Sequence, residues 1–186
     1  WCSVAFSLDA PAPVLKHELV SAGARPLVLP WVEALLETAK VQLAQLDAIA
    51  VGIGPGAFTG VRLGVAIAQG LATSCDLPVL PITSLDAIAA QLIKTTNFCQ
   101  ALVKDFIVAI DARMDEVYWA RYEISPGNLD LPKRIGDIHL SKPEELDTTG
   151  IQFLAGSAIK AFGDRLYSKA GVSMPPSALN AEITTT

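Results

Sequence analysis

Apolar runs separated by glycine-rich or polar turns divide this chain of 186 residues into alternating strands and helices. The most informative stretch is Ala48 to Ala72. A branched apolar segment, Ala48 to Ile53, meets a glycine-dense turn there, and a helix of small residues, Val61 to Ala72, follows at once. This order, without a linker, predicts a strand, a tight turn and a helix packed back on that strand.

The turn in this stretch is a glycine-rich elbow, which could either bind an anion or allow the helix to pack closely on the sheet. Gly54, Gly56 and Gly60 permit positive φ angles, and Thr59 is placed to cap the first N–H groups of the helix. No Lys follows Gly60, so the spacing is not a Walker loop, and it fits a dinucleotide or serine-hydrolase turn no better. Packing of the helix on its own strand is favoured over anion binding, and both stay open.

The second half of the chain repeats the plan of the first. Phe106 to Ile124 alternates as a β-hairpin does, and its second arm, Val117 to Ile124, resembles Cys2 to Leu8. Ile151 to Leu166 then repeats the order of strand, glycine-containing turn and helix found at Ala48 to Leu71. The sequence therefore predicts a duplicated α/β protein.

Two lobes follow from this repeat, residues 1–98 and residues 99–186. The first half has no counterpart to the strand Phe106 to Asp111, so we expect a first strand to be missing ahead of Trp1. At the other end Ser173 to Thr186 is polar and contains proline, so we expect the second lobe to stop before its closing helix is complete.

Composition and charge exclude several classes of protein. Hydrophobic residues make up 51% of the chain, enough for a sizeable core, and the net charge is −5 with Lys and Arg scattered. We therefore expect a soluble protein that does not hold nucleic acid alone. The longest apolar helix, Val61 to Cys75, is too short to cross a bilayer. Three widely spaced cysteines, Cys2, Cys75 and Cys99, suit the cytoplasm.

The chain offers little for chemistry of its own. His17 and His139 have no His, Cys or carboxylate partner at metal-ligand spacing, so we expect no metal site. No nucleophile with an adjacent base can be assembled from the spacings, and no catalytic residue is assigned.

Two helices carry more apolar surface than one sheet face needs. In the first, Leu27, Trp31 and Leu35 form one row, and Val28, Val32 and Leu36 form a second row beside it. In the second helix, the small residues Gly64, Ala68 and Ala72 form a row that lets another helix approach closely. We predict a partner interface on this helix pair, although burial of both helices in the core explains the pattern equally well. The candidate interface residues are Leu27, Trp31, Val32, Leu36, Arg62, Val65 and Gln69.

The motif GIGPGAFTGVRLGVAIAQGLA, followed by VAIDARMDEVYWARYEI, resembles the TsaB (YeaZ) family over nearly the whole chain. That family lies within the superfamily of actin-like, sugar-kinase-like and Hsp70-like ATPases. The resemblance implies a two-lobed actin-like (ribonuclease H-like) duplicated fold, with mixed sheets and flanking helices.

The resemblance also implies a function. TsaB proteins are non-catalytic partners of the catalytic subunit TsaD in forming threonylcarbamoyladenosine in tRNA, and the ATPase TsaE joins them. By resemblance the helix pair binds TsaD, or forms a homodimer when TsaD is missing. tRNA would be met only through the complex, no cofactor would be tightly bound, and ATP would be used by the partner complex.

The hairpin turn bears on whether nucleotide chemistry is retained. ATP-binding members of the superfamily hold phosphates in glycine-containing hairpin turns, but here Asp111 is followed by Ala112, Arg113 and Met114. Asp111, Asp115 and Glu116 also leave the turn acidic unless Arg113 offsets their charge. We expect ATP hydrolysis to be lost and the turn to be either solvated or a partner contact. The competing hypotheses are a nucleotide-binding, kinase-like enzyme and a glycopeptidase-like enzyme.

Overall fold

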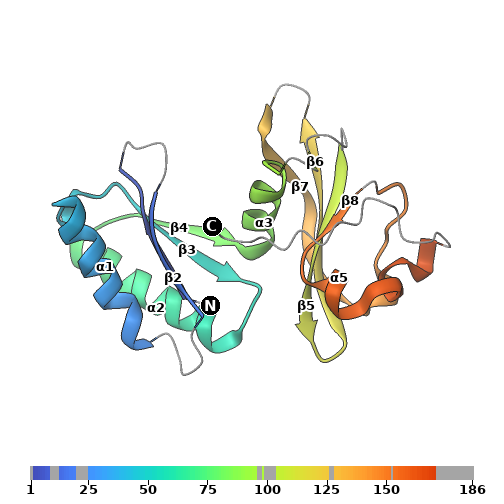
Figure 1. Ribbon diagram of the computed structural model, residues 1–186, viewed down its shortest axis with the longest axis horizontal. Helices are drawn as coiled ribbons and strands as arrows, with labels where there is room; N and C mark the ends of the chain where they lie inside the picture. Colours follow the sequence, from blue (N-terminus) through green and yellow to red (C-terminus); the bar gives the residue numbers. More distant parts are fainter. Residues whose placement is uncertain are drawn as a thin grey trace. The chain divides into compact units, whose positions relative to one another are not determined.

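The computed structural model describes residues 2–8, 13–19, 25–95, 98, 104–125, 128–151 and 153–170 (Figure 1). The chain divides into two compact units. Unit 1 is Trp1–Ile53 with Ala57–Ile82, and unit 2 is Gly54–Gly56 with Thr83–Thr186. The division after Ile82 comes earlier than the expected one after residue 98.

Unit 1 contains a hairpin, two longer helices and a second pair of strands. Its elements are β1 (Cys2–Phe6), β2 (Val14–Glu18), α1 (Arg25–Ala39), the 3-10 turn η1 (Leu43–Gln45), β3 (Ile49–Gly54), α2 (Phe58–Cys75) and β4 (Val79–Thr83). β1 pairs with β2 in antiparallel register, and β3 pairs with β4 in a separate two-stranded sheet. No strand described in unit 1 joins the two sheets.

Unit 2 is built on one mixed sheet of four strands, in the order β7-β6-β5-β8. Its elements are α3 (Ser84–Leu92), β5 (Asp105–Arg113), β6 (Glu116–Ser125), β7 (Asn128–Ser141), the 3-10 turn η2 (Pro143–Glu145), β8 (Phe153–Ala155), α5 (Ala158–Phe162) and the 3-10 segment η3 (Gly163–Ala170). β5 is antiparallel to β6 and parallel to β8. The predicted β-hairpin is confirmed. Its turn consists of Met114 and Asp115, between the end of β5 and the start of β6.

Strand β5 is covered on both faces. Phe106 and Val108 lie in a buried cluster with α3, whereas Ile107 and Ala109 lie in a second buried cluster with α5. Figure 1 shows α3 and α5 on opposite faces of the sheet. Because successive strand residues point to opposite faces, one strand organises both halves of the core.

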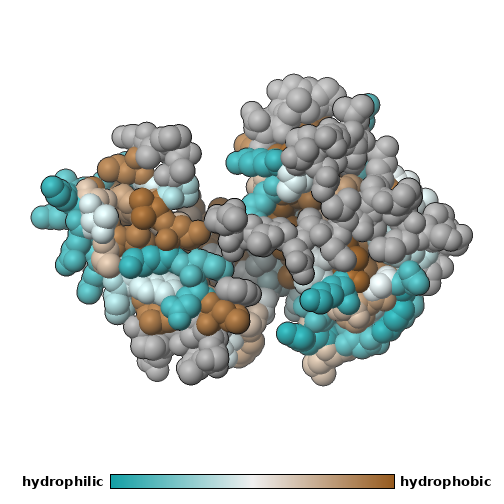
Figure 2. Space-filling model, in the orientation of Figure 1, coloured by the Kyte–Doolittle hydropathy of each residue, from teal (hydrophilic) through white to brown (hydrophobic). Residues whose placement is uncertain are grey.

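Unit 1 has a thinner core. Among its described residues the buried apolar ones are Cys2, Leu35, Ala68 and Ala72. Large apolar side chains are instead exposed on its strands, helices and adjoining turns, and they are Leu8, Val14, Leu15, Leu19, Leu29, Ile53, Phe58, Leu80 and Ile82. Figure 2 shows apolar surface over unit 1, interrupted by hydrophilic side chains.

The repeated strand, glycine turn and helix are confirmed in both units. Gly54 ends β3 with φ +87° and Gly156 follows β8 with φ +111°. A Cβ on Gly156 would lie 2.1 Å from the carbonyl oxygen of Ala109 in β5. Only glycine allows this approach, so close packing explains the elbow in unit 2.

The elbow between β3 and α2 corrects one expectation. Helix α2 begins at Phe58, not at Val61, and its N-cap is Ala57, without a side-chain hydrogen bond. Thr59 therefore lies inside the helix and does not cap it. Farther along, a Cβ on Gly64 would lie 3.9 Å from Cγ2 of Val51 in β3, which favours packing on the strand.

A polar contact joins α3 to the sheet of unit 2. The hydroxyl of the buried Tyr122 donates a 2.7 Å hydrogen bond to Oδ1 of Asp86, and a guanidinium nitrogen of Arg134 lies 3.4 Å from Oδ2. The amide of Asp86 also donates to Oγ1 of Thr83, which caps the helix. Burial, together with the neighbouring carboxylate, raises the pKa of Tyr122. These contacts place α3 in unit 2.

Tyr122→Phe is predicted to lower the free energy of unfolding by about 1.5–3 kcal/mol, because a part-buried hydrogen bond to a carboxylate is lost. Urea unfolding followed by circular dichroism measures the change. Tyr118→Phe, a half-buried tyrosine on the same face of β6, is the control and should change stability less. Equal losses in the two variants would contradict the contact's role.

Gly156→Ala is predicted to destabilise the chain by more than about 3 kcal/mol, because the added methyl group collides with backbone of β5. Gly136→Ala is the matched control, since Gly136 also has a positive φ, +74°, but a Cβ placed there would have nothing within 4 Å. Only backbone strain of about 1 kcal/mol is expected there. Thermal unfolding separates the two, and similar midpoints would refute the packing explanation.

Candidate functional site

The apolar side of helix α1 is only partly covered. Pro30 lies inside the helix, which begins at Arg25. Of the two predicted apolar rows, Leu35 alone is buried, and Trp31 and Leu36 are half-buried. Leu27 and Val32 are likewise half-buried. These four predicted interface residues thus retain accessible apolar surface.

Helix α2 turns its small residues inward. Ala68 and Ala72 are buried and Gly64 faces Val51, so this row packs within unit 1 instead of receiving another helix. Of the predicted interface residues on α2, Val65 is half-buried, and Arg62 and Gln69 are exposed.

Arg62 has an aromatic neighbour. Its guanidinium carbon lies 3.6 Å from the centroid of the Phe58 ring, which is 68% exposed. Because α2 begins at Phe58, Arg62 lies beyond the first turn of the helix. A stacked arginine and aromatic ring on the surface is a common composition of protein interfaces.

The β5–β6 hairpin tip is a second candidate site. Arg113, Met114 and Asp115 all have positive φ, from +52° to +66°. An oxygen of Asp111 accepts a 2.8 Å hydrogen bond from the amide of Arg113, and its other oxygen lies 3.3 Å from the Arg113 guanidinium. Arg113 therefore offsets the charge of Asp111. Glu116 begins β6 opposite Arg113 and is half-buried.

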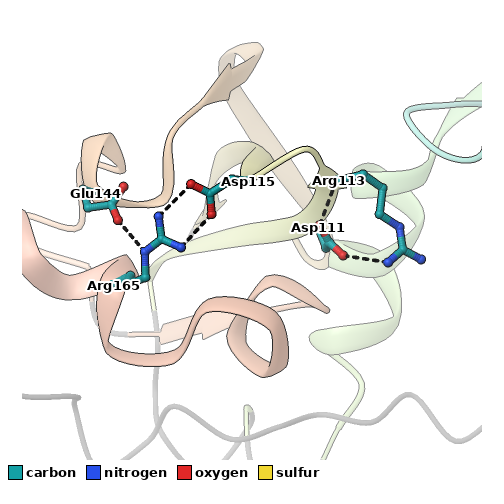
Figure 3. Close-up of polar contacts among 5 residues, drawn as sticks. All are labelled: Asp111, Arg113, Asp115, Glu144 and Arg165. Atoms are coloured by element: carbon teal, nitrogen blue, oxygen red, sulfur yellow. Dashed lines mark hydrogen bonds and ion pairs between the residues drawn. The ribbon is translucent and has the colours of Figure 1, made fainter.

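Arg165 of η3 fixes the other side of the tip (Figure 3). It donates two hydrogen bonds to Asp115, of 2.6 and 3.0 Å, and its Nε donates to Glu144 in η2. These bonds hold the pKa of the Asp115 carboxyl, and that of Glu144, below their ordinary values, and they raise the pKa of Arg165. We call these three residues the Arg165 clamp.

The Arg165 clamp has no signature in the sequence. Arg165 lies 50 residues from Asp115 in the chain, and no local pattern relates them. The clamp leaves Arg113 and Met114 as the outward side chains of the tip, with Met114 88% exposed. Phosphate needs free backbone N–H groups at such a turn, and here the Arg113 amide is bonded to Asp111. The tip is suited to protein contact more than to phosphate.

The described ranges hold little other site chemistry. No group of three or more His, Cys, Asp or Glu side chains there could hold a metal ion. None of the helices in those ranges combines the length and hydropathy of a membrane span. One polar pair departs from the sequence prediction that no nucleophile lies next to a base. Oγ of Ser3 in β1 lies 2.6 Å from Nδ1 of His17 in β2.

Comparison with protein families gives one match over most of the chain. The sequence model of TsaD, described as tRNA N6-adenosine threonylcarbamoyltransferase, matches residues 18–169. Among curated proteins, the tRNA threonylcarbamoyladenosine biosynthesis protein TsaB of Haemophilus influenzae is 42% identical over 120 residues, 64% of this chain and 48% of that protein. TsaB of Escherichia coli is 39% identical over 122 residues, which cover 66% of this chain and 50% of that protein. The chain spans about half the length of these relatives.

Solved structures agree with the actin-like expectation. A crystal structure of an uncharacterized protein with similarity to peptidase YEAZ from Pseudomonas aeruginosa superposes with a TM-score of 0.75 at 31% identity, covering 96% of this chain and 80% of that one. YeaZ from Pseudomonas aeruginosa gives a TM-score of 0.74 at 30% identity, covering 94% and 76%. The predicted two-lobed α/β fold class is confirmed.

Arg165→Gln is predicted to raise the pKa of Asp115 toward its ordinary value of 3.8, because the guanidinium that stabilises the carboxylate is removed. NMR titration of the Asp115 side-chain carbonyl measures the shift. Folding lowers the pKa of Asp115, so the clamp stabilises the folded chain when the pH is above 3.8. This contribution to stability is lost as the pH falls through the lowered pKa and Asp115 becomes protonated.

The control for this titration is Arg113→Gln, because Arg113 pairs with Asp111 and not with Asp115. It should leave the titration of Asp115 unchanged. An equal shift in both variants, or no shift with Arg165→Gln, would show that the Arg165 clamp does not hold the turn in solution.

Proposed function

Because the chain belongs to the family of the tRNA N6-adenosine threonylcarbamoyltransferase TsaD, we propose that it is an accessory subunit in forming threonylcarbamoyladenosine in tRNA. Its curated relatives are TsaB proteins named for that biosynthesis. The subunit pairs with a TsaD-type catalytic subunit, and its own contribution is binding, not chemistry.

The observation that carries this proposal is the apolar surface of unit 1. Side chains such as Leu29 and Phe58 are exposed on its helices, while Trp31, Val32 and Val65 of the same two helices are only half-buried. Covering one large apolar side chain contributes about 1.5–3 kcal/mol. A partner that covers several of them gains enough free energy to form a stable complex, which gives this surface a function.

The hairpin tip supports a non-catalytic role. Arg113 and Met114 extend outward where phosphate binding calls for glycine, and the Arg165 clamp fixes the turn in that form. Micromolar binding of ATP by this chain alone in calorimetry would favour the kinase-like alternative and contradict the proposal.

The remaining partners follow from the same assignment. A TsaE-type ATPase joins the pair and uses ATP there, and tRNA is met through the complex. In the absence of the catalytic subunit the helix faces of two copies pair, so homodimer and heterodimer compete for α1 and α2. We place the assembly in the cytoplasm, where tRNA is modified.

One contact favours a second candidate function, hydrolysis of the peptidase kind. Ser3 and His17 have the spacing of a nucleophile and its base. They lie opposite each other on a regular hairpin, however, and Ser3 does not sit at a sharp turn of the nucleophile-elbow type. A fluorophosphonate probe distinguishes the two functions: labelling that Ser3→Ala removes would support hydrolysis.

Val65→Glu or Val32→Glu is predicted to abolish co-purification with a TsaD-type subunit, because either places a carboxylate in the apolar face. Ser74→Glu is the matched control: it adds the same charge on α2 at an exposed position, about two and a half turns from Val65 and therefore on the opposite side of the helix. Circular dichroism checks that all three variants stay folded. Unchanged co-purification of folded Val65→Glu and Val32→Glu would refute the interface.

A further inference from the structure

The tip of the β5–β6 hairpin has a backbone conformation that its side chains disfavour. Arg113, Met114 and Asp115 have φ angles of +66°, +52° and +64°. Short hairpin turns usually meet this requirement with Asn and Gly, which adopt positive φ readily. Here two long side chains and a carboxylate occupy these positions instead. A strained turn of this composition points to a use for the side chains themselves.

Neighbouring elements of unit 2 hold this turn from both sides. The amide of Asp111 donates a 3.1 Å hydrogen bond to Oγ of Ser157, in the elbow between β8 and α5. Oδ1 of Asp111 in turn accepts the 2.8 Å bond from the Arg113 amide. On the other side, the Arg165 clamp holds Asp115. The shape of the turn is therefore fixed before any partner binds, which lowers the entropy that binding would cost.

The two residues outside the clamp are strongly exposed. The side chain of Arg113 is 87% exposed. Met114, at 88%, is the most exposed large apolar residue in the described part of the chain. Figure 3 shows the Arg113 side chain pointing away from Arg165. Met and Arg are both enriched where proteins bind one another, and a thioether packs well against aromatic rings. The tip thus presents one apolar and one cationic group on a fixed turn.

The charge around the tip decides what kind of partner fits it. Three cationic side chains lie there, those of Arg113, Lys142 and Arg165. The carboxylates at or beside the tip are those of Asp111, Asp115, Glu116 and Glu144. An RNA strand would bring several phosphates close to these carboxylates and be repelled. A single carboxylate on a protein can instead form paired hydrogen bonds with Arg113. The charge balance therefore favours a protein partner.

We propose that the hairpin tip is a second docking site of this chain, for a partner subunit of the same assembly. Met114 enters an apolar pocket of that partner, and Arg113 pairs with a carboxylate at the rim of the pocket. Arg165 is a positioning residue, because it holds the turn without contacting the partner. The site lies in unit 2, whereas the helix face assigned to the catalytic subunit lies in unit 1. The inference rests on the proposed function for the choice of assembly.

The probe is the purified pair of TsaD-type and TsaE-type subunits, immobilised without tRNA, and biolayer interferometry measures its affinity for the chain. Met114→Gly and Arg113→Gln are each expected to weaken binding at least about tenfold. The thermal midpoint of Met114→Gly should not fall, because glycine relieves the strain at φ +52°. Unfolding would then not explain its loss of binding. Leu131→Ala, at an exposed apolar position on β7 of the same unit, is the control and should leave the affinity unchanged.

A double-mutant cycle tests the positioning role of Arg165. Arg165→Gln is expected to weaken binding about threefold or more in the otherwise unchanged chain. It should cause no further loss in a chain that carries both Met114→Gly and Arg113→Gln, because the clamp acts only through those two side chains. An equal loss in both backgrounds would overturn the positioning role.

Three results would overturn the docking site itself. The first is unchanged affinity of Met114→Gly and Arg113→Gln for the immobilised pair. The second is binding of tRNA alone that either substitution weakens, which would assign the tip to RNA. The third is self-association that Met114→Gly abolishes, which would assign it to a second copy of the chain. If the unsubstituted chain does not bind the pair, the proposed function falls as well, whereas tight binding that ignores the tip removes this inference alone.

Discussion

Burial of one strand on both faces is the constraint on which unit 2 depends. Phe106 and Val108 serve the cluster under α3, and Ile107 and Ala109 serve the cluster under α5. Because the same strand also bonds to β6 and β8, its position fixes the sheet, the elbow at Gly156 and the hairpin tip together. A substitution that disturbs the packing of β5 is therefore expected to destabilise both core clusters of unit 2.

The described residues of unit 1 contain no strand in the position of β5. They form two separate strand pairs with a small core, and several large apolar side chains are exposed. An apolar surface of this kind is stabilised by whatever covers it. This is the physical basis on which we propose that the unit binds a partner.

Features that depend on local pattern could be predicted from the sequence. Alternation identified the hairpin of β5 and β6, and the glycine turn between an apolar strand and a helix identified both elbows. The prediction that Thr59 caps helix α2 was wrong, because the helix begins at Phe58 and Ala57 is its N-cap residue.

Contacts between distant residues could not be predicted in this way. Arg165 reaches Asp115 across 50 residues, and Tyr122 reaches Asp86 across 36, so no periodic pattern relates the partners. The second of these contacts also explains why α3 belongs to unit 2 and why the observed division comes before it. The interface residues on α1 and α2 stay a prediction, because half-burial fits either a loose core or a covered face.

Hydrogen exchange resolved by residue compares the strands of the two units in one sample, and so tests whether burial on both faces makes β5 the most stable part of the fold. We expect the amides of residues 106–109 in β5 to exchange slowest, and those of β1 and β3 to exchange much faster. Exchange in β1 and β3 as slow as in β5 would contradict this account.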